Sequence, residues 1–354
     1  MFSKALATGF LAAALVASAA TVQADDVFNM GGTRNPTTGV WTGLASVDMV
    51  AVGNPGNAAD PATGNLYGSV AYTYQIGKCD VTLSQYTAFL NAVAKTDTYG
   101  LYNTNMATDF PTNYSTNIGI SRSGSSGSYS YSVTGNGNMP VFDVTWGGAA
   151  RFCNWLQTGT TETGAYTLNG ATLDAALMAI TRNANATYVI PSENEWYKAA
   201  YYKGGSNNAG YWFYPTQSNT TPSNVLSATG TNNANFWYWD GGFTDPTNYL
   251  TPVGAFADSP GPYGTFDMGG DVWQWNEANI DGAYRGLRGG GWDFGYDELV
   301  ASAANGIETP TYEGNFYNGI YAGFRVAFVP EPGSITLLVA GALSLVAYGW
   351  RRRR

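Results

Sequence analysis

Two glutamates in one short run are the first residues of this chain whose spacing could serve catalysis. Glu193 and Glu195 lie in the segment Pro191–Trp196, where one could act as a general acid and the other as a general base. The same segment also fits a helix start, because Ser192 and Glu195 have the spacing of a capping box. Caps use the same residue types, so we favour the structural interpretation and predict a helix from this point with Trp196 on its buried side.

The sequence contains few side chains that could bind a transition metal or act as a nucleophile. The chain has no histidine, which excludes a Ser-His-Asp triad, a His-ligated zinc and a two-His-one-carboxylate iron site in their usual forms. Cys79 and Cys153 are its two cysteines, so at most one internal disulfide can form and a cysteine-rich metal cluster is excluded. Cys153 falls in an amphipathic stretch, where we expect a buried, inert thiol.

Local patterns predict the elements that must hold these residues. Alternation over 72–77 predicts a strand, and the run 47–52 is a short extended piece before it. Residues 96–138 are polar and of low complexity, so we expect a surface insertion with a short strand at 129–133. Two further helices are predicted from their caps: one from Thr82 or Ser84 to about Val93, and one over Trp146–Leu156 with Thr145 as its cap.

Composition limits the fold class. Charged residues make up 12% of the chain and aromatic residues 15%, and there are 45 glycines. Globular chains average about 25% charged residues, so this chain must fill its core largely with aromatic rings and form many turns at Gly and Asn. We therefore expect few helices, with turn-rich segments at 25–45 and 210–328.

Both ends of the chain carry membrane-directed segments. Lys4 precedes an apolar stretch that ends in the small-x-small site Val22-Gln23-Ala24, so residues 1–24 are predicted to be a secretory signal peptide. At the other end, the apolar run 335–350 is followed directly by four arginines. This run is at the short limit for a transmembrane helix, and the arginines would keep its end on the cytoplasmic side.

A further signal lies just before that helix. Pro330, Glu331 and Pro332, together with the apolar run and the arginines, resemble the PEP-CTERM sorting signal of Gram-negative bacteria, which a membrane transpeptidase of the exosortase class processes. Residues 330–354 would then anchor a precursor in the inner membrane, with the body outside the cytoplasm and later in the cell envelope or extracellular matrix. An ordinary C-terminal anchor is the alternative, and whether the signal is cut or retained is open.

The net charge of the chain limits the kinds of molecule that it can bind. The chain has 16 basic and 25 acidic residues, and loss of both end segments would remove Lys4, four arginines and Glu331. The body would keep 11 basic and 24 acidic residues, a net charge of −13. We expect no nucleic acid or anionic lipid as a partner, because a basic patch to neutralise phosphates is missing, whereas cation binding is compatible with this charge.

Six ordered segments resemble the signature segments of the formylglycine-generating enzyme family, also called the sulfatase-modifying-factor family. They are Val81-Thr82 with Gln85-Tyr86, Met139-Pro140-Val141 through Trp146 to Trp155, Ile190–Glu193 through Trp196, Tyr263-Gly264 through Trp275, Arg288–Trp292, and Gly323–Val326. The resemblance implies one α+β domain of the C-type-lectin-like kind over residues 46–328, with little regular secondary structure. It also implies core positions for Cys79 and Cys153.

Resemblance to this family does not imply the oxidase activity that some of its members have. In the oxidase members, two cysteines beyond the Arg-Gly-Gly segment capture copper and the substrate thiol, since only sulfur supplies that soft ligand and redox chemistry. Phe294 and Leu299 occupy those positions here. The sulfoxide synthases of the family hold iron with three histidines, which this chain lacks. We therefore expect no copper, iron or zinc.

Calcium is the metal that the resemblance does imply. It prefers carboxylate, amide and backbone oxygens. Gln274 stands in place of a usual Glu, and Asp267 would restore the lost charge where some members have Asn. The alternative is that these residues only make turns. One implied site uses the side chains of Asn235 and Asp245 with the carbonyls of Phe236 and Thr247, and a second uses the side chains of Asp267 and Gln274 with the carbonyls of Gly270 and Val272.

Two functions from different classes stay open. The favoured one is a non-enzymatic envelope or matrix protein, which uses a calcium-supported domain to bind an extracellular saccharide or protein after processing by an exosortase-type enzyme. The alternative is an enzyme with a remodelled pocket, in which Arg288, Trp292, Asp293 and Asp297 act on a small substrate. Aromatic richness fits the stacking of sugars and equally fits a loop-rich core.

Overall fold

The structure is a computed structural model. It describes residues 46–108, 118–239, 241–303, 306–312 and 320–330, with Met30 and the short strands at 27–28, 33–34, 41–42 and 314–315. The predicted signal peptide, most of the segment 25–45 and the sorting signal beyond Pro330 lie outside the described residues. In the part of the chain that is described, none of the helices combines the length and hydropathy of a membrane span.

Short helices and strands alternate with long irregular segments, and this mixture confirms the predicted α+β class. The helices are α1 (Leu83–Val93), α2 (Asn105–Thr108), α3 (Trp146–Thr158), α4 (Asp174–Met178) and α5 (Glu193–Tyr201), with 3-10 turns η1 (Pro61–Thr63) and η2 (Tyr296–Glu298). The strands are β1 (Val27–Phe28), β2 (Thr33–Arg34), β3 (Trp41–Thr42), β4 (Val47–Val52), β5 (Tyr74–Gly77), β6 (Gly119–Ser123), β7 (Ser130–Thr134), β8 (Tyr188–Val189), β9 (Trp273–Ile280), β10 (Tyr284–Arg288), β11 (Gly306–Glu308), β12 (Gly314–Asn315), β13 (Ile320–Phe324) and β14 (Ala327–Phe328).

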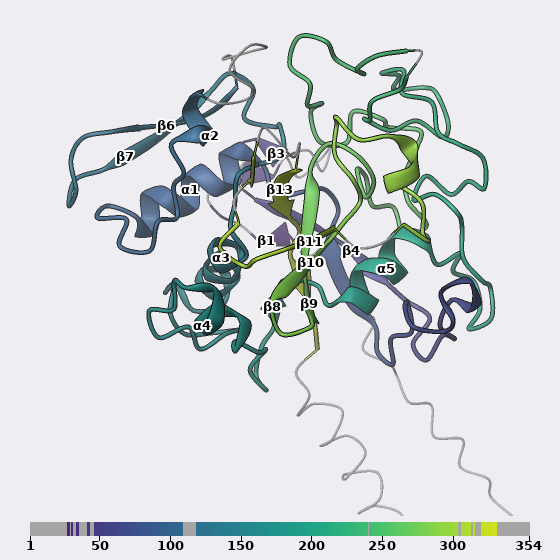
Figure 1. Cartoon of the computed structure of the whole chain (residues 1–354), viewed down its shortest axis with the longest axis horizontal. Coiled ribbons are helices and arrows are strands. Elements are labelled where there is room, and N and C mark those ends of the chain that lie inside the picture. Colours follow the sequence, from purple (N-terminus) through teal and green to yellow (C-terminus); the bar gives the residue numbers. More distant parts are fainter. Residues whose placement is uncertain are drawn as a thin grey trace, which may run out of the picture.

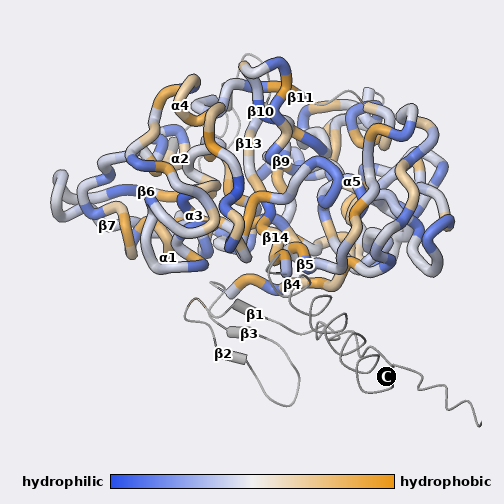
Figure 2. The backbone as a smooth tube through the Cα atoms, turned by 90° about the horizontal axis from the view of Figure 1, so that it is seen from below, coloured by the Kyte–Doolittle hydropathy of each residue, from blue (hydrophilic) through white to orange (hydrophobic). Residues whose placement is uncertain are grey.

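Two five-stranded sheets form the framework. The first is antiparallel with the order β1-β4-β5-β14-β8, so β14, the last of the described strands, lies between β5 from the start of the domain and β8 from its middle. The second has the order β11-β10-β9-β13-β12, and β9 and β13 run parallel with Gly323 opposite Gln274. Figures 1 and 2 show β9, β10 and β13 at the centre, with α1 and α3 on one side and α5 on the other.

The three longest helices begin where their caps predicted. Thr82 and Gln85 form a capping box at the start of α1, and Ser192 and Glu195 form another at the start of α5. The side chain of Thr145 caps α3. These contacts lie within three residues of each helix start, which is why the sequence was sufficient to place them.

The segment 96–138 corrects the prediction of a surface insertion. Its strands β6 and β7 form a hairpin, with β7 at 130–134 where 129–133 was predicted, and the hairpin packs on α1. The Tyr131 hydroxyl donates to the carbonyl of Ala94, and Asn91 bonds both backbone groups of Tyr131. Ile120 is fully buried in the main core. The segment is polar along its turns, but its apolar side chains belong to the core.

Three fully buried tryptophans fasten the helices and loops to β9. Because a buried indole N–H needs an acceptor, each of these bonds fixes an approach angle as well as a contact. The apolar stretches of β4, β5 and β14 gather in the neighbouring layer (Figure 2). The indole bonds run from Trp146 to the Asn276 carbonyl (3.1 Å), from Trp196 to the Gln274 side chain (2.7 Å) and from Trp275 to the Val144 carbonyl (2.7 Å).

Candidate functional site

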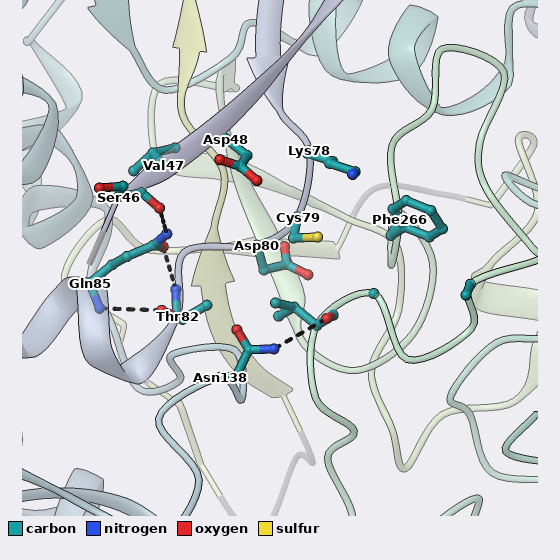
Figure 3. Close-up of a pocket in the computed structure, with 13 residues that line it drawn as sticks. Ser46, Val47, Asp48, Lys78, Cys79, Asp80, Thr82, Gln85, Asn138 and Phe266 are labelled. Carbon is teal, nitrogen blue, oxygen red and sulfur yellow. Dashed lines mark hydrogen bonds between the residues drawn. The ribbon is translucent and has the colours of Figure 1, made fainter. Parts of the chain in front are cut away.

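A cavity of about 380 Å³ opens between β4, the start of α1 and the loop 253–266 (Figure 3). Lys78, Cys79 and Asp80 follow directly after β5 and point to the side of the cavity on which Phe266 lies. The Lys78 ammonium is 5.6 Å from the centre of the Phe266 ring. We call this cavity the Lys78 pocket. Its lining is mixed in charge and polarity, which suits a small polar ligand.

Asp80 forms a buried wall of the Lys78 pocket. Its Oδ2 lies 3.3 Å from the Arg325 guanidinium, and its Oδ1 has no hydrogen-bond partner among the described atoms. Burial raises the pKa of Asp80 well above its ordinary value, although the Arg325 charge acts in the opposite direction. Arg325 also donates to the carbonyls of Gly77 and Phe266 and to Gln274, so it ties three segments together.

Cys79 corrects the expectation that both cysteines lie in the core. It is partly exposed and lines the Lys78 pocket, because Gly254 faces its sulfur and has no side chain to cover it. Burial and the nearby Asp267 charge raise the pKa of the Cys79 thiol, so the thiol stays protonated and is a poor nucleophile. Cys153 is fully buried in α3, as predicted, and both cysteines are free thiols.

The two glutamates of α5 are held by ion pairs. Arg288 Nη2 lies 2.6 Å from Glu193, and Arg182 Nη2 lies 2.9 Å from Glu195. Burial acts to raise the pKa of Glu195, but the charge and hydrogen bonds of Arg182 outweigh it, so the pKa lies below its ordinary value. Glu195 is therefore an ionised cap rather than a proton donor. Arg288 is bonded to Glu193 and to the Ala303 carbonyl, so its charge is already engaged.

The remaining pocket candidates lie in the segment after Arg288. Trp292 is buried and its ring centre is 4.8 Å from that of Tyr249. Asp293 is partly exposed, its Oδ1 is buried without a hydrogen-bond partner, and burial raises its pKa to about 7. Asp297 is exposed on η2. The predicted group is thus spread between a buried ring, a half-buried carboxyl and the surface.

Phe294 and Leu299 occupy apolar surroundings. Leu299 is fully buried in a small cluster with Tyr214, Ala234 and Phe236. Its side chain also fills the space beside Gly269 and Gly290, with 3.2 Å from Leu299 Cγ to the point where a Cβ of Gly269 would lie. Phe294 packs its ring edge-on against Trp273, with 5.2 Å between ring centres.

The first predicted calcium ligand set is partly compatible with a cation. Asn235 Oδ1 is buried without a hydrogen-bond partner among the described atoms, while its Nδ2 donates to the Tyr249 carbonyl and to Asp271. Asp245 Oδ1 accepts from the backbone N–H of Thr247 and of Asn248, so it caps a turn. The Phe236 carbonyl accepts two long bonds, at 3.3 and 3.4 Å. An orphaned buried oxygen is what a cation would satisfy.

In the second predicted calcium ligand set, the side-chain oxygens already accept hydrogen bonds. Gln274 Oε1 accepts from the Trp196 indole at 2.7 Å and from the Arg325 guanidinium at 2.9 Å. Asp267 Oδ2 accepts from Gly254 N, and its carbonyl accepts from Gln274 Nε2. Gly270 and Val272 are both buried, and Gly270 forms a backbone bridge with Asn235. A calcium ion bound through Gln274 would have to displace two donors, one of them charged.

Asp271 is a buried acid that the sequence reasoning missed. Its Oδ1 accepts from Asn235 Nδ2 (2.7 Å) and Thr251 N (2.8 Å), and its Oδ2 accepts from the Thr251 hydroxyl. Burial and the nearby Asp267 charge raise its pKa to about 7. Its position between the predicted ligands Gly270 and Val272 was the feature of the sequence that could have identified Asp271 as part of the site. Over the described ranges, no group of three or more His, Cys, Asp or Glu side chains is placed to hold a metal ion.

Comparison with known proteins places these features in a family. The sequence matches the model of the sulfatase-modifying factor enzyme 1-like domain over residues 56–329, and no curated protein matches it. CarF aligns at 20% identity over 81% of this chain and 100% of its own, with a TM-score of 0.47. Treponema denticola variable protein 1 aligns at 20% identity over 85% and 99%, with a TM-score of 0.49. PvdO from Pseudomonas aeruginosa aligns at 18% identity over 80% and 92%, with a TM-score of 0.39. The family model matches most of the length of this chain. The chain therefore belongs to the family of sulfatase-modifying factor enzyme 1-like domains, as its six ordered segments predicted.

Proposed function

We propose that this chain is a non-catalytic member of its family, which acts outside the cytoplasm as a binding or structural module of the cell envelope or extracellular matrix. The chemistry at positions 294 and 299 carries the proposal. Phe294 and Leu299 offer no thiolate for copper or for a substrate sulfur. Leu299 is closed into an apolar cluster, so the position also has no room for solvent or substrate.

The Lys78 pocket supports binding over nucleophilic catalysis. Its cysteine is held in the protonated form, and its buried carboxyl is paired with Arg325. The chain has no histidine, the usual base that activates a cysteine, and the carboxylates near Cys79 raise the pKa of its thiol. What remains is a polar cavity of about 380 Å³ with an ammonium at its edge, which is sufficient to hold a small ligand.

Export and membrane sorting rest on the two ends of the sequence. Residues 1–24 would direct secretion, and residues 330–354 would hold the precursor in the inner membrane until an exosortase-type enzyme processes it. Deletion of residues 330–354 should release the protein into the periplasm or medium, as followed by fractionation and immunoblotting. Full-length protein that fractionates with the cytoplasm would contradict this part of the proposal.

Calcium support is proposed at the first ligand set. Asn235 and Asp245 would hold the ion together with the carbonyls of Phe236 and Thr247, and the ion would brace the loops that carry them. The unsatisfied Oδ1 of Asn235 favours this set over the second, in which Gln274 Oε1 already accepts two hydrogen bonds.

An enzyme with a remodelled pocket is the second candidate. The observation that favours it is Asp293, whose pKa of about 7 and unpaired Oδ1 are typical of a general base. Arg288 would not assist it, because its guanidinium is bonded to Glu193.

The proposal is tested by an assay for the reaction of the family oxidases, the conversion of a peptide cysteine to formylglycine. The full-length protein is incubated with a sulfatase-type cysteine peptide, copper and oxygen, beside an active family oxidase as a positive control. We expect no formylglycine by mass spectrometry. Turnover by the unmodified protein would overturn the non-catalytic assignment, and turnover that disappears in Asp293→Asn would establish the remodelled pocket.

The double variant Phe294→Cys with Leu299→Cys tests whether adding the two thiols creates a copper site. It should bind copper in a spectroscopic titration if the surrounding backbone matches that of the oxidases. Activity would further require the residues that orient the two thiolates. Each single variant is the matched control, because one thiolate alone cannot reproduce the pair.

A further inference from the structure

A second cavity lies away from the Lys78 pocket, in the loop-rich segment between α5 and β9. It has a volume of about 310 Å³ and is lined by Thr221, Pro222, Ser223, Asn224 and Tyr238. We call it the Tyr238 groove. We propose that the Tyr238 groove binds a neutral saccharide, which rests on the proposed binding function and names its ligand class. The volume is at the lower end of the range for small-molecule sites, about 300 to 1,000 Å³.

An aromatic surface continues from the groove. Tyr238 and Tyr296 are each 37% exposed, and their ring centres are 6.2 Å apart. Fully buried Phe236 supports both rings edge-on, at 6.3 and 6.4 Å. Aromatic faces that stay exposed while anchored to the core offer apolar area at a low cost in side-chain entropy. Such faces suit the apolar C–H face of a sugar ring.

Trp239 adds a second exposed ring next in the chain. It is 79% exposed, and its ring centre is 4.4 Å from that of Trp237. Because Trp239 directly follows Tyr238, it adds to the exposed rings of Tyr238 and Tyr296, and a group of exposed apolar side chains, unlike a single one, is typical of an interaction site.

The polar lining can recognise hydroxyl groups. Asn224 Nδ2 donates to the carbonyls of Gly242 (2.8 Å) and Phe236 (3.3 Å), which fixes the amide and leaves its Oδ1 as an acceptor. Among the described residues, Ser223 Oγ accepts one long bond, from Val225 N at 3.3 Å. Hydroxyl and amide groups both donate and accept, as sugar hydroxyls do.

Charge and rigidity favour a neutral sugar over other ligands. None of the five lining residues is charged, and a body of net charge −13 repels acidic glycans. Two backbone hydrogen bonds hold Tyr238 in place, in which Tyr238 N donates to Gly242 O (3.0 Å) and Gly242 N donates to Tyr238 O (2.7 Å). A preformed wall reduces the entropy lost on binding.

The test uses the full-length protein in a detergent without a sugar head group, with cellohexaose, maltohexaose and mannohexaose as probes. Calorimetry should detect binding of at least one probe, with partial quenching of tryptophan fluorescence from exposed Trp239. Tyr238→Ala and Tyr296→Ala should each weaken that binding by about tenfold or more, while Tyr238→Phe, which keeps the ring face, should retain most of it.

Tyr284→Ala is the matched control, because Tyr284 is also 37% exposed but lies on β10. It should bind like the wild type, and thermal melts should show that all variants are folded. Absence of binding to all three probes overturns the saccharide assignment, and so does preference for a proline-rich peptide at the same residues. Binding that survives both alanine variants overturns the groove as the site. None of these outcomes affects the formylglycine assay, so the non-catalytic proposal is tested separately.

Discussion

At the scale of single residues, the unusual feature of this domain is its group of buried acids. Asp80 and Asp271 are buried and Asp267 is partly exposed, and the positive charge of Arg325 acts on Asp80 and Asp267. If all three acids were ionised, two negative charges would be uncompensated in a medium of low dielectric constant. Burial therefore raises the pKa of each acid, and that of Asp271 to about 7.

Asp293 allows this effect to be measured. Burial raises its pKa from 3.8 to about 7, and because the pKa of Asp271 is also raised to about 7, the contribution of Asp293 is taken as the difference between the wild type and Asp293→Asn. The folded state therefore keeps a proton that the unfolded state has released, so stability from this group is complete below about pH 4 and is lost as the pH rises to about 7. Relative to Asp293→Asn, the free energy of unfolding of the wild type should fall by up to about 1.4 kcal/mol per pH unit over this window in urea titrations.

Asp297→Asn is the control for that experiment, because Asp297 is exposed in the same segment. It should follow the wild-type pH dependence. Equal slopes in the wild type and Asp293→Asn would show that Asp293 ionises in the folded state as easily as in water, which would also remove the argument for a general base.

At the scale of elements, the start of α5 joins a local cap to a long-range ion pair. Glu195 accepts from Ser192 N within the capping box and is also bonded by Arg182, which lies outside the helix. Tyr72 donates to the same carboxylate. The helix start is thus tied to the segment before β5 and to the loop before β8, so its cap contributes to tertiary structure.

Substitutions at this helix start should separate the two contributions. Ser192→Ala removes one cap and should lower the free energy of unfolding by about 1 kcal/mol. Glu195→Ala also removes one of the two carboxylates paired with Arg182, leaving Glu277 at 2.7 Å, and it takes the acceptor from the partly buried Tyr72 hydroxyl, so it should cost about 3 kcal/mol. Thr145→Ala in α3, where the cap has no ion pair, is the control at about 1 kcal/mol. Equal losses at Ser192 and Glu195 in denaturant titrations would show that the ion pair contributes little.

At the scale of the whole molecule, the loops between α5 and β9 are the least regular part of the domain. Few backbone ladders hold them, and Asn235 links them to β9 through the bridge to Gly270 and the bond to Asp271. A metal bound at Asn235 and Asp245 would add cross-links where the sheet adds none.

Calcium should therefore raise the melting temperature of the wild type relative to chelator, because an ion that binds only the folded state stabilises it by about 2.7 kcal/mol at 100 times its dissociation constant. Asp245→Asn keeps an oxygen for the turn but loses the charge, and it should abolish the calcium effect. Asp258→Ala, at an exposed position in the same loops, should leave it intact. A melting temperature that chelator does not change in the wild type would count against the site.

The sequence by itself determined what depends on neighbours in the chain. Helix starts at Thr82, Thr145 and Ser192 were predictable because a cap and the N–H groups that it satisfies lie within three residues. The family was predictable because its segments occur in order, and order survives where overall similarity is low. That Phe294 and Leu299 carry no thiol is a property of residue type alone.

Only the tertiary structure decided which residues share a buried environment. The ion pair of Asp80 and Arg325 joins positions 245 apart in the chain, and the exposure of Cys79 depends on a glycine in a distant loop. The hairpin β6–β7 looked like a surface insertion, because the apolar side chains that bind it to α1 are few among its polar turns. Burial, pKa and access are set by contacts between distant segments, and those contacts leave no local pattern in the sequence.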